Sequence, residues 1–169
     1  IKDVTQYKDF SHTICEINCV HVIIDDISAA IDEFKDCISD TSWIGKLDEL
    51  SQRTFKALAN RTIDNIVNQI IGKMTTALNS DIGEYIVSHT AQSILEAEFR
   101  HTKIPLAELL KEKIAGNPGF DFHSISEKRF LIFGEAKYSA DDTPRALALN
   151  QIGEFITLEK DYAELNSYR

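Results

Sequence analysis

The residues of this sequence best suited to joint chemistry lie in the segment Phe133-Gly134-Glu135-Ala136-Lys137. Residues two apart on a strand point to the same side, so the side chains of Glu135 and Lys137 are predicted to project together. The apolar run 130–133 predicts a buried strand, where an unpaired carboxylate costs free energy. A divalent cation would partner this carboxylate. The alternative is an ion pair between Glu135 and Lys137 on an edge strand.

A second carboxylate is expected beside this one. In Phe120-Asp121-Phe122 the two phenylalanines are predicted to face the core, and Asp121 the opposite side. A hairpin closed by residues 126–129 would bring Asp121 next to Glu135. Converging carboxylates repel each other, and Mg²⁺ resolves that repulsion. We therefore expect the carboxylates to share one or two ions, with the Lys137 amine at the rim.

Two helices are predicted to add polar groups. The stripe that carries Glu84 is otherwise apolar, and a second apolar stripe suggests that this helix is packed on two sides. Glu84 has no basic neighbour at helical spacing, so it needs a ligand. Gln151 likewise stands on a partly apolar stripe of the last helix.

The pattern from residue 80 onward predicts the order helix, hairpin, helix. Capping residues, hydrophobic periodicity and turn residues give the boundaries. The predicted elements are one or two strands in 13–24, helix 27–38, a helical region 46–78 broken at Asn60 or Gly72, helix 80–100, a short helix 105–113, a turn 116–119, strands 120–125 and 130–138, and a helix from Asp141 or Asp142 to 165.

This arrangement over residues 80–165 resembles the PD-(D/E)xK nuclease superfamily. The resemblance implies an α/β fold, with a restriction-endonuclease-like mixed sheet flanked by helices and a mostly helical N-terminal extension. It implies that Glu84, Asp121, Glu135 and the carbonyl of Ala136 bind Mg²⁺, or Mn²⁺ in its place. Lys137 would orient or activate the attacking water, and Gln151 would complete the catalytic set.

The chain departs from the superfamily pattern at two points. Phe120 stands where proline is usual. The superfamily core also has a strand after the last helix. Either the N-terminal strand fills that role, or the chain is truncated.

The spacing of Gly119-Phe120-Asp121 and Gly134-Glu135-Ala136-Lys137, behind a long helical region, is also similar to the nuclease subunits of Hachiman-type anti-phage systems. Those subunits act with a helicase. Residues 1–78 are accordingly expected to form a partner-docking or regulatory region, and residues 79–169 are expected to form the nuclease core. The expected function is that of a Mg²⁺-dependent deoxyribonuclease, an endonuclease or nickase, serving as effector subunit of a defence complex.

Two alternatives remain open at this point. A catalytically inactive nuclease fold could bind nucleic acid or protein, although the intact Asp/Glu/Lys set argues against this. An unrelated α+β binding protein could use Glu135 and Lys137 as a structural pair.

Charge and composition bear on the partners. The net charge is −9, and residues 1–60 hold eleven acidic but only six basic side chains, whereas 97–145 hold eight of each. DNA binding gains affinity from cationic contacts with phosphates, so the isolated chain is expected to bind DNA weakly and to need a helicase or translocase partner. The sequence contains no apolar run of about 20 residues and no secretory signal, which predicts a cytoplasmic protein without a membrane span.

The cysteines support the same compartment. They are Cys15, Cys19 and Cys37, an odd and sparse set that suits a reducing environment. Cys15 and Cys19 lie near His12 and His21, which raises zinc binding as an alternative. Buried thiols are the favoured interpretation.

Overall fold

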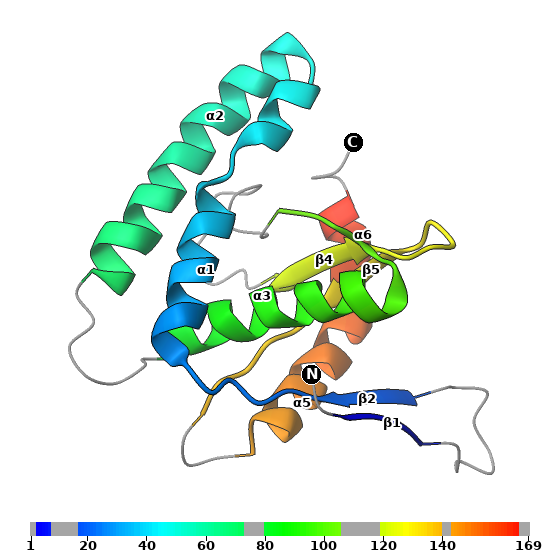
Figure 1. Cartoon of the computed structure of the whole chain (residues 1–169). Helices are drawn as coiled ribbons and strands as arrows, with labels where there is room; N and C mark the ends of the chain where they lie inside the picture. Colours follow the sequence, from blue (N-terminus) through cyan, green and yellow to red (C-terminus); the bar gives the residue numbers. More distant parts are fainter. Residues whose placement is uncertain (1–2, 8–16, 73–79, 106–118, 140–142, 166–169) are drawn as a thin grey trace. The chain divides into compact units, whose positions relative to one another are not determined.

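The computed structural model of the chain describes residues 3–7, 17–72, 80–105, 119–139 and 143–165 (Figure 1). The chain divides into two compact units, Ile1–Glu33 and Phe34–Arg169. The boundary expected at residue 78 falls inside the second unit. There Phe34 stacks on Tyr85, with 5.7 Å between ring centroids, so helices on either side of residue 78 share one core.

The first unit contains an antiparallel hairpin. Its strands are β1 (Asp3–Tyr7) and β2 (Ile17–His21), paired from Asp3↔His21 to Tyr7↔Ile17. Only the second of these strands was predicted. Cys19 is exposed, so the buried-thiol interpretation is wrong for this residue. Cys15 and His12 lie outside the described residues.

Helix α1 (Ile27–Ser39) begins in the first unit and ends in the second. The carboxylate of Asp26 accepts a hydrogen bond from the Ala29 N–H at 3.0 Å, which satisfies one of the donors that a helix start leaves unpaired. The predicted helix 27–38 and its aspartate cap are confirmed.

The predicted helical region after α1 consists of three segments. These are the 3₁₀ helix η1 (Ser42–Lys46), α2 (Glu49–Asp64) and the π-helix η2 (Asn65–Ile71). Asp48 caps α2 by accepting hydrogen bonds from the backbone of Leu50 and Ser51. Helix α2 runs through Asn60, so the chain does not break there, and whether it breaks at Gly72 depends on residues 73–79, which lie outside the description. Apolar side chains buried in these segments are Ile44, Ala59, Ile66 and Ile71, and α1 adds Phe34 and Ile38.

A three-stranded sheet forms the centre of the second unit. Its order is β3 (Thr102–Lys103), β4 (Phe122–Ile125) and β5 (Leu131–Gly134), with both pairings antiparallel. A mixed sheet was predicted, but the strands within the described ranges include no parallel pair. The predicted turn 126–129 is confirmed, because Arg129 N–H bonds Ser126 O at 2.8 Å with Arg129 at a φ of 64°.

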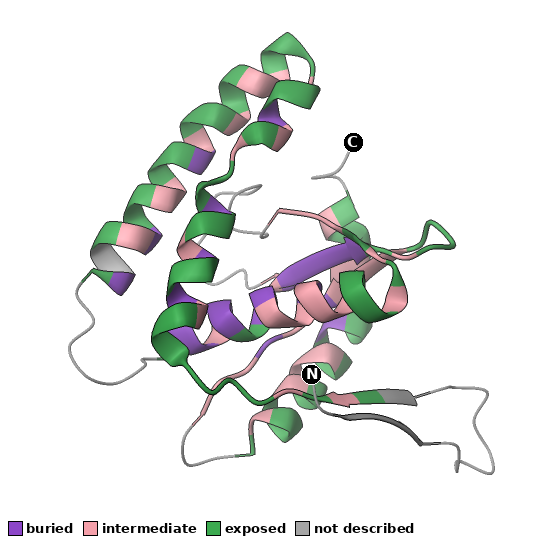
Figure 2. Ribbon diagram, in the orientation of Figure 1, coloured by how far each residue is buried: buried purple, intermediate pink, exposed green. Residues whose placement is uncertain are grey.

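Helices cover both faces of this sheet. Helix α3 (Ser80–Phe99) lies on one face, and α5 (Pro144–Thr157) and α6 (Lys160–Leu165) lie on the other (Figure 1). One continuous helix was predicted for α5 and α6. The chain instead breaks at Glu159, whose φ of 52° is incompatible with a right-handed helix. Because helices cover both faces of the sheet, β4 is buried along most of its length (Figure 2).

The predicted short helix 105–113 and most of the predicted turn 116–119 lie outside the described ranges. Within those ranges, no helix has the length and apolar character needed to cross a bilayer.

Candidate functional site

The ammonium group of Lys137 lies between two carboxylates. Its Nζ is 2.6 Å from Oε1 of Glu135 and 3.5 Å from Oε1 of Glu84. The predicted same-side projection of Glu135 and Lys137 is therefore confirmed. Strand β5 ends at Gly134, so both residues stand just beyond the ladder instead of inside it.

Asp121 holds this segment in place from the neighbouring strand. It occupies a bend before β4, and its N–H donates to the Gly134 carbonyl at 2.9 Å. Its carboxylate oxygen Oδ2 accepts a 2.7 Å hydrogen bond from the N–H of Ala136. Asp121 thus contacts the backbone between Glu135 and Lys137, as the hairpin predicted.

Two glycines allow the close approach that assembles the cluster. A Cβ built on Gly83 would lie 2.1 Å from Cγ of Tyr138, and one on Gly134 would lie 2.1 Å from Cζ of Phe122. Gly83 precedes Glu84 in sequence, and Tyr138 follows Lys137. The contact between them therefore brings α3 against the segment that carries Lys137.

Burial dominates the electrostatics of the cluster. The side chain of Glu135 is 0% exposed, and this burial, reinforced by the nearby Asp121 carboxylate, raises its pKa to about 7 against the opposing effect of Lys137. Burial also raises the pKa of Glu84, again with Asp121 adding to the rise. Burial alone would lower the pKa of Lys137, but the surrounding carboxylates, with Glu135 foremost, hold it above its ordinary value.

The donor chemistry of the cluster suits a hard cation. Carboxylate oxygens are the ligands that Mg²⁺ prefers, and neither oxygen of Glu135 has a hydrogen-bond partner in the described structure. Buried oxygens without a hydrogen bond are rare in folded proteins. Glu135 Oε1 relies instead on its ion contact with Lys137.

The arrangement differs from the prediction in one respect. Lys137 was expected at the rim of the carboxylates, but it lies between Glu84 and Glu135. Over the described ranges, no group of three or more His, Cys, Asp or Glu side chains is arranged to hold a metal ion. The physical reason is that Lys137, on a long flexible stem, supplies the positive charge that the buried carboxylates require.

Gln151 is not linked to the other predicted catalytic residues. It is half-buried on α5. It makes no hydrogen bond or ion pair with Glu84, Asp121, Glu135 or Lys137, all of which the structure describes. The structure therefore brings four of the five predicted residues together.

Two polar residues with positioning roles were missed. The buried amide of Gln92 on α3 donates to the carbonyls of Ile104 (2.7 Å) and His123 (2.9 Å), which ties the helix to the end of β3 and to β4. Glu164 on α6 contacts His123 and the Phe120 backbone. Gln92 could have been found as a polar residue in a helix whose neighbours are apolar, but Glu164 gave no comparable signal.

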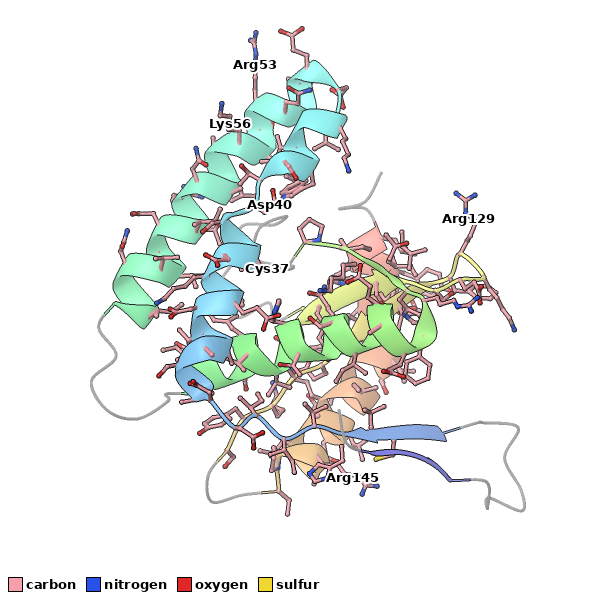
Figure 3. All side chains as sticks on the ribbon, in the orientation of Figure 1. Cys37, Asp40, Arg53, Lys56, Arg129 and Arg145 are labelled. Atoms are coloured by element: carbon pink, nitrogen blue, oxygen red, sulfur yellow. The ribbon has the colours of Figure 1, made fainter. Side chains whose placement is uncertain are left out.

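Three basic residues that the structure describes near the sheet, Arg100, Lys103 and Arg129, form no ion pair with the carboxylates of the cluster. Arg129 is at the hairpin turn, pointing away from the strands (Figure 3). Strand β5 has four residues, so this turn and Gly134 are separated by about 13 Å. Arg100 and Lys103 form ion pairs with Glu127 and Glu96.

Comparisons of the chain with protein-family models, curated proteins and solved structures found no match. Any functional conclusion therefore depends on the geometry of the cluster and on the motif resemblance.

Proposed function

We propose that this chain is a metal-dependent DNA endonuclease or nickase of the PD-(D/E)xK type. The observation that carries the proposal is the buried Glu135 carboxylate. Apart from the contact of Oε1 with the Lys137 ammonium group, its oxygens have no hydrogen-bond partner in the described structure. The nearby Asp121 carboxylate adds to the rise that burial causes in the pKa of both Glu135 and Glu84. Such strongly perturbed groups gather at functional sites.

Each residue of the cluster has a role in this proposal. Asp121, Glu135 and Glu84, with the Ala136 carbonyl, would hold Mg²⁺ or Mn²⁺. The bound ion would supply a nucleophilic water at neutral pH and neutralise charge on the phosphate. Lys137 would exchange its contacts with the two glutamates for a hydrogen bond that orients the water.

The charge distribution extends the proposal to a partner. A net charge of −9 repels a polyanion, and residues 1–60 carry five more acidic than basic side chains. A helicase or translocase with a basic surface would dock on the N-terminal region and deliver DNA. The similarity to Hachiman-type nuclease subunits supports an effector role in anti-phage defence.

A second candidate function is a binding module with an inactive nuclease fold. It is favoured by one observation, that the described residues contain no ready-made group of three metal ligands. In this case Lys137 is the permanent counter-ion of Glu135. Metal binding separates the two candidates, because an inactive module has no need of Mg²⁺ or Mn²⁺.

The test combines metal binding with DNA cleavage. We expect Mn²⁺ to bind the wild-type chain in calorimetry, and the double variant Glu135→Ala/Lys137→Ala to lose both metal binding and plasmid cleavage. Cleavage is to be measured with and without the candidate helicase. The matched control is Glu33→Ala/Lys35→Ala, which removes the same residue types at the same spacing from α1.

Two results would contradict the proposal. One is a folded wild-type chain that binds neither Mg²⁺ nor Mn²⁺. The other is Mg²⁺-dependent cleavage by the Glu135/Lys137 double variant at the wild-type rate.

A further inference from the structure

Helix α6 contacts the start of β4 through one carboxylate. Glu164 Oε1 accepts a 2.8 Å hydrogen bond from the N–H of Phe120, and Oε2 lies 3.1 Å from Nε2 of His123. The two contacts use different oxygens of the same side chain. Glu164 therefore fixes both the backbone before Asp121 and a side chain two residues after it.

These contacts are well shielded from water. The side chain of His123 is 0% exposed and that of Glu164 is 11% exposed. Hydrogen bonds to a charged acceptor are stronger than neutral ones, and shielding from solvent strengthens them further. The rings of Phe120, Phe133 and Phe155 pack around the same place, with 4.9 Å between the centroids of Phe120 and Phe133 and 4.8 Å between those of Phe120 and Phe155.

The break between α5 and α6 makes this contact possible. Leu158 N–H closes α5 onto the Glu154 carbonyl, and Glu159 then turns the chain with a φ of 52°. Helix α6 starts in a new direction, and Glu164 near its end reaches β4. The break between α5 and α6 thus coincides with the contact of Glu164 with Phe120 and His123.

A short series of covalent bonds and hydrogen bonds connects Glu164 to the cluster. Phe120, whose N–H is held by Glu164, is covalently joined to Asp121. Asp121 in turn bonds Gly134 O through its N–H and Ala136 N–H through its carboxylate. The position of Phe120 therefore sets where the Asp121 carboxylate meets the Glu135–Lys137 segment.

We propose that Glu164 is a positioning residue for Asp121, holding its carboxylate on the Ala136 N–H from the opposite side of the sheet. The functional part of this inference rests on the proposed nuclease activity, because it predicts that Glu164 tunes metal binding without touching the ion. The structural part stands without it.

The test is amide hydrogen exchange by NMR on the full chain, which needs neither metal nor DNA. In Glu164→Ala, exchange at Phe120, Asp121 and Ala136 should accelerate by about tenfold or more, since each amide loses a hydrogen bond directly or through displacement. Amides of α3 should be unchanged. Glu164→Gln keeps an acceptor for Phe120 N–H and should restore most of the protection.

The matched control is Glu154→Ala, which removes an exposed glutamate from α5. If Glu164→Ala does not fold, Glu164→Asp replaces it, because aspartate keeps the charge but shortens the side chain by one methylene. Acceleration confined to Phe120, with Asp121 and Ala136 as in wild type, would overturn the inference. So would a uniform acceleration over all amides.

Calorimetry with Mn²⁺ separates this inference from the proposed function. Weaker Mn²⁺ binding by Glu164→Ala, with wild-type affinity in Glu154→Ala, supports positioning of the site. An absence of Mn²⁺ binding by the wild type would overturn the proposed function, while the exchange data would still decide whether Glu164 positions Asp121.

Discussion

Replacing Glu135 with glutamine removes the ionisable group that is most perturbed by burial while keeping its size and shape. The folded protein holds the pKa of Glu135 at about 7, against 4.5 for an ordinary glutamate. The folded state therefore binds this proton more tightly than the unfolded chain does. The stability that Glu135 contributes is fully present below pH 4.5 and is lost as the pH rises to and through 7.

The magnitude follows from the two pKa values. Each tenfold change in proton affinity corresponds to about 1.4 kcal/mol, so the rise from 4.5 to about 7 amounts to about 3 kcal/mol. The side chain of Glu135 is buried but coupled to Lys137, so about 3 kcal/mol is an upper bound on the difference. Glu135→Gln should match wild type near pH 4.5 and exceed it by up to about 3 kcal/mol at pH 8.

Urea unfolding of the metal-free protein measures this difference. Trp43 is the single tryptophan of the chain and packs on Phe55 with 5.8 Å between ring centroids, so its fluorescence reports unfolding of the second unit. The free energies of unfolding of variant and wild type are compared at several pH values in EDTA, with Glu33→Gln as the exposed control. A difference independent of pH, or a wild type more stable than the variant at pH 8, would refute the reasoning.

Three further variants probe the same site and its supports. Lys137→Met removes the cation beside the buried Glu135 and so raises the pKa of Glu135 further. The free energy of unfolding at pH 8 should therefore drop by about 1 kcal/mol and recover toward pH 5, and a pH-independent loss would contradict this. Gly83→Ala places a methyl group against Tyr138 and should lower the free energy of unfolding by about 1–3 kcal/mol in thermal unfolding. Gly153→Ala, with nothing within 4 Å of the new Cβ, should leave it unchanged. Equal effects of the two variants would argue against the close contact of Gly83 with Tyr138. Gln92→Leu removes one buried and one part-buried hydrogen bond and should cost about 2–4 kcal/mol in urea unfolding. An unchanged midpoint would show that the two carbonyls find other donors.

Local sequence patterns predicted many of the helices and strands of the second unit. Periodicity located α3, which starts at Ser80, and the turn residues located the β4–β5 hairpin. Alternation along an extended segment placed Glu135 and Lys137 on one side, and their ion pair confirms it. Each of these features depends on residues within a few positions of one another.

The features that escaped prediction depend on distant residues. Gln92 meets His123 across 31 sequence positions, and Glu164 meets His123 and Phe120 across 41 and 44. Strand β5 is shorter than the run 130–138 because the chain bends at Asp121, so pairing with β4 stops at Gly134. The position of Lys137 between the carboxylates could likewise not be predicted, because it depends on which charged side chains are buried together.

The close contact of Gly83 with Tyr138 has a consequence for how the sequence can change over time. A single hydrogen atom at position 83 determines how near α3 comes to the segment that carries Lys137, and therefore how near Glu84 comes to Lys137. Any larger residue at 83 requires a smaller one at 138 if that distance is to be kept. We expect positions 83 and 138 to change as a pair among related chains, with a small residue at one position whenever the other is large.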